Sequence, residues 1–401
     1  MRTYTTRRLG LGAGLVALSS CGVIAVAGPA AASGGEVAVA VATGAGLEVA
    51  VQQDGAPAAD WTIEPVAGGD AWGSPSLFRQ RSGGLLLTDS DSDGSLWFFW
   101  QGAGATNWNP EEVAGPGSVA GYTQPSIASQ YTVESGEATD TVIVAEDGDG
   151  DYGSTAYWAV NGVPGWHSEK LPSPDGVATQ PDVTVSADNT FLVSYDTDGS
   201  IYTPSSPGFG IDQEAFNSTT WSEVVWLEAD VPFDLEDTSV IEQPGGALIV
   251  GAGDAKGNTY FFWSPAGKAS TTWYQESVET NDFHFALNPS YVQPLTLTGD
   301  DQGVAVGGLS SSDKCDLSVD EPNGGTVWTP QSVGCPGGTG VEPPALDGLQ
   351  SNGYGQTAAT SDAAGNAFFY WQAYGSSTWN AEKIPGISSA NTYTAVALAS
   401  D

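Results

Sequence analysis

A short motif that begins with tryptophan recurs along this chain and limits its possible folds more than any other feature. Six copies of the motif are clear, and a seventh, WSEVVW, begins at Trp221 and lacks the acidic fourth residue. Successive tryptophans lie 47, 58, 55, 52, 55 and 51 residues apart. A period of this length indicates a fold assembled from one repeated unit. The clear copies of the motif, Trp-x-x-(Glu/Gln)-x-(Val/Ile/Leu), begin at Trp61, Trp108, Trp166, Trp273, Trp328 and Trp379.

A second shared unit precedes the motif and combines a tight turn with an apolar strand. The turn reads Asp-x-x-Gly, in which the aspartate accepts backbone N–H bonds and the glycine takes a positive φ without strain. The first copy, Thr43–Gln53, keeps the glycine and has threonine in place of aspartate. The other copies are Asp91–Gln101, Asp196–Thr203, Asp254–Ser264 and Asp362–Gln372.

Each repeat therefore predicts four short antiparallel strands. A strand such as Ala247–Val250 precedes the turn, and a short opener such as Gln124–Ile127 precedes that strand. The sequence shows no helical period after its first 32 residues, and four strands in about 50 residues are typical of a β-propeller blade. We expect an all-β fold with seven four-stranded antiparallel blades.

The two ends of the chain are expected to share one blade. The segment Thr392–Ser400 can supply its opening strand, and Val37–Thr43, Leu47–Gln53 and Trp61–Val66 can supply the other three. Such sharing closes the ring and leaves no open sheet edge. We expect residues 33–401 to form this single domain.

Residues 1–32 have the organisation of a secretory signal. Basic residues are followed by an apolar stretch, and Ala30–Ala32 forms a small-residue cleavage site, so we expect a secreted protein. Arg7 and Arg8 leave export by the twin-arginine route open beside the general route. Leu18–Cys21 also matches a lipoprotein box, so anchoring through Cys21 is a minority alternative, disfavoured by the apolar residues that follow.

Charge excludes one class of partner. After residue 32 the chain keeps 7 of its 10 basic residues and all 48 acidic ones. Because seven cations are too few to form a basic surface, we do not expect nucleic acid as a partner. The same segment has no apolar run long enough to span a membrane.

Two cysteines, Cys315 and Cys335, remain after the signal. In an exported chain such a pair is expected to form a disulfide bond, which would hold one repeat together by about 3 kcal/mol.

The order of these elements resembles that of the secreted seven-bladed propeller lectins of bacteria and fungi, and it is similar to the smaller tachylectin-type propellers. The resemblance extends over Val37–Asp401 and depends on the turn, the aromatic strand that ends in Trp-Gln, and the Trp-x-x-Glu-x-Val motif. It implies sugar sites between neighbouring blades, each lined by an aromatic ring and polar groups. The altered loops of repeats three, four and six imply fewer than seven sites.

Six tryptophans are the candidate ligand-binding residues implied by this resemblance. An indole ring can stack on the apolar C–H face of a sugar while polar neighbours bind its hydroxyls. For any single tryptophan, packing between blades is the more common role of such a repeated ring. The candidates are Trp100, Trp263 and Trp371 near the ends of third strands, and Trp108, Trp273 and Trp379 across the following loop.

Enzymatic functions find less support in the sequence. A sialidase mechanism needs three arginines, and only Arg79 and Arg81 remain after the signal. His167 and His284 are the only histidines, and no nucleophile and base are evident. A glycosidase needs only two carboxylates, which the sequence does not single out.

Calcium is the one cofactor that the sequence suggests. Asp89, Asp91 and Asp93 match the first half of an oxygen-ligand loop. Trp100 stands where such a loop carries its final glutamate, which favours an acidic turn instead.

We therefore predict a secreted, non-catalytic, carbohydrate-binding propeller whose partners are glycans. The alternatives are a propeller scaffold that binds an extracellular protein and, with less support, a glycosidase. Fold alone does not distinguish these functions.

Overall fold

The structure is a computed structural model of the 401-residue chain. Residues 1–32, Cys335 and His284, to which the sequence predictions refer, lie outside the residues that it describes. It describes residues 37–52, 61–68, 72–80, 82–121, 124–131, 138–149, 153–160, 165–172, 179–186, 188–197, 208–214, 220–228, 235–242, 246–254, 258–266, 272–277, 296–300, 303–309, 315–320, 328–333, 345–348, 354–362, 364–373, 378–387 and 397–400.

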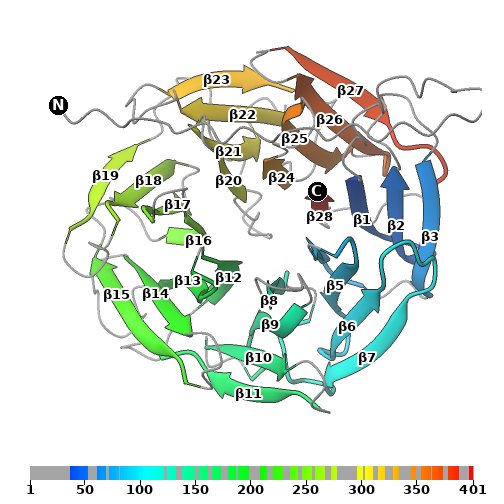
Figure 1. Ribbon diagram of the computed structural model, residues 1–401, viewed down its shortest axis with the longest axis horizontal. Helices are drawn as coiled ribbons and strands as arrows, with labels where there is room; N and C mark the ends of the chain where they lie inside the picture. The colour runs from blue at the N-terminus through cyan, green and yellow to red at the C-terminus, as the bar shows by residue number, and fades with distance from the viewer. Residues whose placement is uncertain are drawn as a thin grey trace, which may run out of the picture.

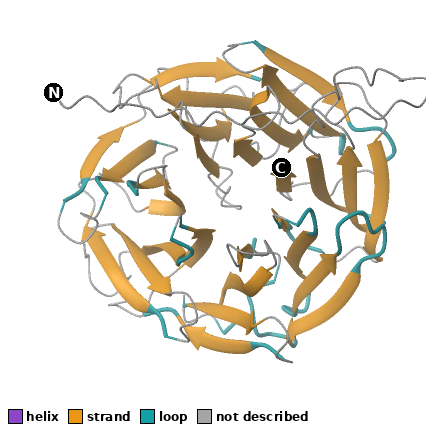
Figure 2. Ribbon diagram, viewed as in Figure 1, coloured by secondary structure: helices purple, strands orange, loops and turns teal. Residues whose placement is uncertain are grey.

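The described residues form β-strands, turns and loops, without helices (Figure 2). The strands assemble into seven four-stranded antiparallel sheets, named sheets I to VII here. Figure 1 shows the sheets arranged around a common centre. The outermost strands are β3, β7, β11, β15, β19, β23 and β27. Within the described ranges no helix is long and apolar enough to cross a membrane.

The bounds of the strands follow the repeat. Sheet I contains β28 (Ala397–Ser400), β1 (Val37–Thr43), β2 (Gly46–Gln52) and β3 (Trp61–Gly68). Sheet II contains β4 (Ser76–Arg79), β5 (Leu85–Ser90), β6 (Leu96–Gln101) and β7 (Asn109–Ala114). Sheet III contains β8 (Ser126–Tyr131), β9 (Ala138–Glu146), β10 (Ser154–Val160) and β11 (His167–Lys170). Sheet IV contains β12 (Thr179–Val185), β13 (Phe191–Thr197), β14 (Gly208–Glu214) and β15 (Ser222–Glu228).

The remaining three sheets have the same plan. Sheet V contains β16 (Leu235–Glu242), β17 (Leu248–Asp254), β18 (Thr259–Ser264) and β19 (Tyr274–Ser277). Sheet VI contains β20 (Thr296–Asp300), β21 (Gly303–Leu309), β22 (Cys315–Asp320) and β23 (Trp328–Ser332). Sheet VII contains β24 (Ala345–Gly348), β25 (Tyr354–Ser361), β26 (Ala367–Ala373) and β27 (Trp379–Lys383).

Sheet I joins the two ends of the chain, as the sequence predicted. β28 pairs antiparallel with β1, from Val37 opposite Ser400 to Ala40 opposite Ala397. The pairing gives β1 a partner on both sides, since β2 lies along its other edge. Every residue of β1 is buried. The ring therefore closes through backbone hydrogen bonds between strands about 360 residues apart in the sequence.

Sheet IV departs from the expected pattern. The sequence placed a third strand directly after the turn that begins at Asp196, within Asp196–Thr203. The strand that pairs with β13 is instead Gly208–Glu214. Its sequence, GFGIDQE, lacks the aromatic pair present in the third strands β6, β10, β18 and β26, so the repeat gave no signal for it.

The hydrophobic core lies between consecutive sheets. Buried side chains of sheets I and II form one cluster, which includes Leu47 and Val49 on one side and Leu87 and Phe99 on the other. Similar clusters join sheets II and III, III and IV, IV and V, and VII and I. Each sheet that contributes to two of these clusters is buried on both faces, which explains strands such as LWFFWQ.

A polar contact near the centre links three sheets. Asp182 of β12 accepts hydrogen bonds from the hydroxyls of Ser126 in β8, at 2.7 Å, and Ser239 in β16, at 2.8 Å. Burial raises the pKa of this carboxyl, while the two hydroxyls act in the opposite direction. The repeated opener that contains Ser126 and Asp182 thus has a structural role, because it ties inner strands of neighbouring sheets together.

The turn glycines allow close approach between sheets. Gly94 has a φ of +78°, and a Cβ there would lie 2.5 Å from the carbonyl oxygen of Val119. Val119 belongs to the segment that enters sheet III, and its N–H donates to the carbonyl of Gly94 at 3.1 Å. The turn of sheet II therefore contacts the segment that leads to sheet III through backbone alone.

We predict that Gly94→Ala destabilises the protein more than Gly104→Ala. Gly104 also has a positive φ, of +67°, but a Cβ there meets nothing within 4 Å. The control should cost about 1 kcal/mol for the left-handed backbone, and Gly94→Ala at least about 2 kcal/mol, because the steric contact adds to that cost. Chemical denaturation measures both values. Equal losses would show that the approach of Val119 is unimportant.

Candidate functional site

The repeated tryptophan motif forms a hydrogen-bonded contact between neighbouring sheets, which we call the latch. Between sheets I and II, Glu64 accepts from the indole N–H of Trp108 at 3.1 Å and from the side-chain amide of Gln101 at 2.7 Å. Trp108 is the first residue of its motif, and Glu64 is the fourth residue of the preceding motif. At this junction the tryptophan of one motif therefore donates to the sheet before it, and the glutamate of the preceding motif accepts from the sheet after it.

Two further latches have the same arrangement, with glutamate as the acceptor in one and glutamine in the other. Between sheets VII and I, Glu382 accepts from Trp61 at 2.7 Å and from Gln52 at 3.1 Å. Between sheets VI and VII, Gln331 accepts from Trp379 at 2.9 Å and from Gln372 at 2.5 Å. The glutamine directly follows the tryptophan of the aromatic strand in sheets II and VII. The spacing of the two sequence motifs therefore encodes this contact.

Three of the predicted ligand-binding tryptophans lie at sheet junctions. Trp108 and Trp379 are partly buried latch donors. Trp273 is partly buried and packs edge-on against Phe209 of sheet IV, with ring centroids 5.6 Å apart. Their indoles contact the neighbouring sheet, and a ligand contact for them stays a prediction.

The other three predicted tryptophans differ in exposure. Trp100 is 44% exposed and Trp263 is 36% exposed, whereas Trp371 is partly buried and stacks on Phe369 at 5.7 Å. The third large exposed hydrophobic among the described residues is Tyr274, at 48%.

Tyr274 is a candidate that the sequence analysis missed. Its ring stacks on Trp263, with centroids 4.2 Å apart and planes at 22°. Tyr274 follows the motif tryptophan directly and lies opposite Trp263 in the pairing of β18 and β19. At the matching positions, Asn109 and Asn380 donate to the carbonyls of Trp100 and Trp371. The exchange of asparagine for tyrosine in WYQESV was the available signal.

Trp100 shares a face of sheet II with an acidic side chain. Phe98 lies opposite Glu111, and Trp100 lies opposite Asn109, in the pairing of β6 and β7. Phe98 contacts Trp166 of sheet III edge-on at 5.2 Å, so this face points toward sheet III. Side chains two residues apart on a strand share a face, so Trp100 and Glu111 both belong to it.

At the junction of sheets II and III the hydrogen bond from the motif tryptophan is not made, and we call this latch open. Ala159 occupies the position of the latch glutamine, because Trp158 pairs with His167 just as Trp100 pairs with Asn109. Glu111, the expected acceptor, is exposed, and the indole N–H of Trp166 makes no hydrogen bond. This junction therefore combines an exposed indole, Trp100, with an exposed carboxylate.

Two of the three aspartates proposed for calcium, Asp91 and Asp93, stabilise the turn of sheet II. Asp91 accepts from the indole N–H of Trp97 at 2.9 Å and from the backbone N–H of Ser95 at 3.0 Å, and Asp93 accepts from the Ser95 hydroxyl at 2.8 Å. Asp89 is fully buried, and desolvation raises the pKa of its carboxyl well above the usual range. In the part of the chain that the structure describes, no three His, Cys, Asp or Glu side chains are placed to share a metal ion. Calcium binding itself stays an untested prediction.

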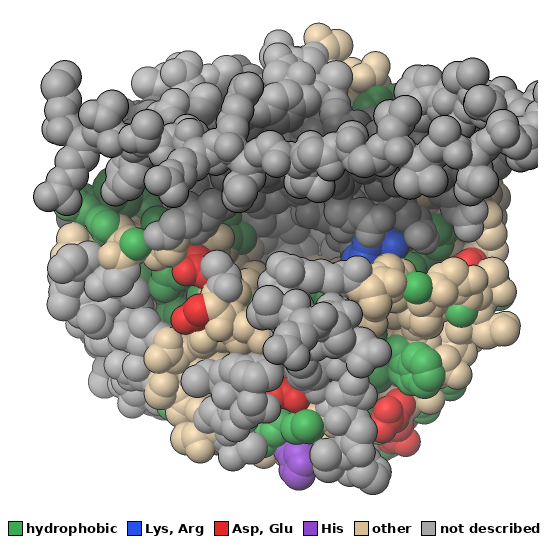
Figure 3. All heavy atoms as spheres, viewed as in Figure 1, with side chains coloured by type: hydrophobic (Ala, Val, Ile, Leu, Met, Phe, Trp, Pro, Cys, Tyr) green, Lys and Arg blue, Asp and Glu red, His purple; other side chains and the backbone are tan. Residues whose placement is uncertain are grey.

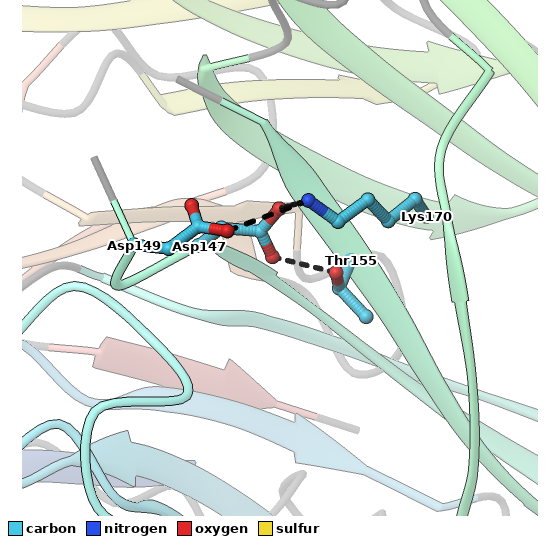
Figure 4. A network of polar contacts seen from close by, with 4 residues as sticks. All are labelled: Asp147, Asp149, Thr155 and Lys170. Carbon is cyan, nitrogen blue, oxygen red and sulfur yellow. Dashed lines mark hydrogen bonds and ion pairs between the residues drawn. The ribbon is translucent and has the colours of Figure 1, made fainter. Parts of the chain in front are cut away.

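The second acidic turn pairs with one of the few cations. Asp147 accepts from the Thr155 hydroxyl at 2.6 Å, and Lys170 lies 3.2 Å from Asp147 and 3.6 Å from Asp149 (Figure 4). Figure 3 shows acidic, apolar and neutral side chains interspersed over the described part of one face, with basic side chains confined to one small area. These features give no positive surface among the residues visible there.

Comparison with known proteins places the fold among lectins. No protein-family model and no curated protein sequence matches this chain. The BP39L lectin from Burkholderia pseudomallei is similar in structure, with a TM-score of 0.64 and 14% identity over 87% of this chain and 95% of the lectin. The fucose-specific lectin from Aleuria aurantia has a TM-score of 0.52 and 11% identity, over 80% of this chain and 97% of the lectin. AofleA from Arthrobotrys oligospora gives 0.51 and 11%, over 82% and 89%. The chain shares the fold of these proteins.

We predict that Trp108→Phe weakens the protein more than Trp166→Phe. Both changes remove an indole N–H and leave an aromatic ring, but only Trp108 donates to a buried carboxylate. Because a hydrogen bond to a charged group is lost, Trp108→Phe should lower the free energy of unfolding by about 2 kcal/mol more than the control. Equal losses in urea denaturation would contradict the latch.

Proposed function

We propose that this chain is a secreted, non-catalytic, carbohydrate-binding protein, and that its seven sheets are the blades of a closed seven-bladed β-propeller. The signal-like residues 1–32 support export, and the lectins that share its fold support sugar binding. Within this proposal Cys315 and Cys335 form a disulfide bond in the oxidising environment outside the cell.

The observation that carries the proposal is the exposure of three aromatic rings, whereas most other large rings among the described residues are buried. Trp100, Trp263 and Tyr274 present wide apolar surfaces to solvent at third and fourth strands. Exposure of such rings costs the protein the free energy that burial would give, so a ligand that covers them is favoured. A sugar fits, because its C–H face is apolar and its edge is polar.

The first proposed site lies at the junction of sheets II and III. Trp100 supplies the stacking surface, and the exposed carboxylate of Glu111 on the same face accepts hydrogen bonds from sugar hydroxyls. The open latch leaves Glu111 available, whereas Glu64 at the junction before it is buried by its two donors. A neutral sugar suits this site better than an acidic one, because Glu111 would repel a second carboxylate.

The second proposed site is the stacked pair Trp263 and Tyr274 on sheet V. The two parallel rings form a flat surface larger than one indole, which suits a disaccharide or an extended glycan chain. Two sites on one rigid ring favour multivalent glycans, since the second contact forms at a high effective concentration.

A protein-binding scaffold is the second candidate function. Exposed tryptophan and tyrosine are also the residues that anchor protein interfaces. The same three exposed rings support it. Free monosaccharide should compete with glycan binding and leave a protein complex intact.

We predict that Trp100→Ala and Trp263→Ala each weaken glycan binding by about tenfold, because each removes the stacking surface of one site. The double variant should lose the signal on a glycan array that includes fucosylated glycans. Thermal melting should show that the fold survives, since both rings are substantially exposed. Unchanged array binding by the folded double variant would refute the proposed sites.

We also predict that Glu111→Gln weakens binding at the first site while Glu112→Gln does not. Both carboxylates are exposed on β7 and adjacent, so they point to opposite faces of the sheet. The amide of the variant is a poorer acceptor for sugar hydroxyls than the carboxylate. Isothermal titration with the best array ligand, in a Trp263→Ala background, separates the first site from the second. Equal behaviour of the two glutamine variants would place the ligand elsewhere.

A further inference from the structure

The junction of sheets III and IV carries an altered latch. Glu214, the last residue of β14, occupies the position that Gln101 holds in sheet II, since Gln213 pairs with Ser222, the residue after the motif tryptophan. The acceptor position on sheet III is Glu169, the fourth residue of the motif WHSEKL that begins at Trp166. At this junction, therefore, a carboxyl group replaces the amide donor and meets the usual carboxylate.

We propose that this junction is a proton-dependent latch, in which protonated Glu214 donates to Glu169 and ionised Glu214 repels it. A protonated carboxyl has one O–H donor, as the amide has N–H donors, whereas an ionised carboxylate has none. The junction closes in the same way as the latch of Gln101 and Glu64 when the proton is present. It loses its donor and gains a like-charge repulsion when the proton leaves.

The surroundings of Glu214 support this assignment. Glu214 is 3% exposed, and its Oε1 atom makes no hydrogen bond. The indole N–H of Trp221, the motif tryptophan of sheet IV, also lacks a partner, although its counterparts Trp61 and Trp108 donate to the latch acceptor. The two donor positions of the latch on sheet IV are thus both buried, without the hydrogen bonds that close the latch elsewhere.

The charges that face Glu214 are acidic. Asp140 of β9 and Glu169 of β11 lie on the opposing sheet, and both raise the pKa of Glu214 by repulsion. Burial is the largest cause, and together the three effects raise the pKa to about 7. Asp212, two residues away on β14, shares the face of Glu214 and is also buried. The nearest cation along β11, Lys170, pairs with Asp147 instead.

Two other ionisable groups face this junction. His167 of β11 is exposed and stacks on Trp158 at 5.6 Å, so it lies at the surface of the junction. Tyr195 of β13 donates its hydroxyl to the carbonyl of Pro172 at 2.8 Å. Glu214 is the buried carboxyl of this junction whose pKa is raised to about 7.

The sign of the pH effect follows from the raised pKa. The carboxyl binds its proton more tightly in the folded protein than in the unfolded chain, whose pKa is near the ordinary value of 4.5. Folding is therefore stabilised by this proton at low pH, and that stabilisation is lost as the pH rises through about 7.

Glu214→Gln tests the latch, because it restores the amide donor found at Gln101. We expect its Tm to match that of the wild type near pH 5 and to exceed it increasingly as the pH rises to 8. Glu112→Gln, which changes an exposed carboxylate on β7, should show no such growing difference. A Tm difference for Glu214→Gln that is constant with pH would overturn the proposal.

A second measurement covers the case in which Glu214→Gln does not fold. In the wild type, the side-chain carboxyl ¹³C signal of Glu214 should titrate near neutral pH, and Glu169→Gln should lower its midpoint by removing a facing charge. Titration of Glu214 near 4.5 would overturn the latch. Neither readout depends on sugar binding, so a failure here is distinct from a failure of the proposed function.

Discussion

The contact between an aromatic ring and the next sheet holds this ring of sheets together. Sheets arranged around a centre diverge toward the outside, and large side chains must fill the widening space. The same edge-on contact recurs at three junctions: Phe98 with Trp166 at 5.2 Å, Phe369 with Trp61 at 5.6 Å, and Phe209 with Trp273 at 5.6 Å. In each pair the second ring is the first residue of the repeated motif. The motif is retained along the chain because it fills this space.

The latch fixes the orientation of each sheet relative to its neighbour, which aromatic packing alone does not do. A hydrogen bond to a buried carboxylate has demanding geometry, so it fixes how one sheet faces the next. Glu64 satisfies this demand with two donors from sheet II. Where the donors or acceptors change, the junction has other properties: Ala159 leaves Glu111 exposed, and Glu214 makes its junction sensitive to protons. Variation of this one contact thus distinguishes the junctions that serve packing alone from the two to which we assign a ligand site or a pH dependence.

The acidic residues have several roles that their number alone conceals. Asp182 ties three inner strands together, Asp91 orders a turn and holds the indole of Trp97, and Glu64 joins two sheets. Each of these carboxylates accepts more than one hydrogen bond, which offsets the cost of removing it from water. The acidity of the chain is therefore partly structural, and Glu111 is available at the surface.

The sequence by itself determined the all-β class, the repeat and the sharing of one sheet by the two ends, because these follow from local strand and turn preferences repeated at a fixed period. It missed β14, whose residues lack the aromatic signature, and it grouped six tryptophans that the structure separates. Only the tertiary structure decided that Trp108 donates to Glu64 while Trp100 is exposed, and that Glu214 faces Glu169. These relations join side chains of different sheets, about 45 residues apart, and depend on which face of a strand each side chain occupies once the sheets have packed.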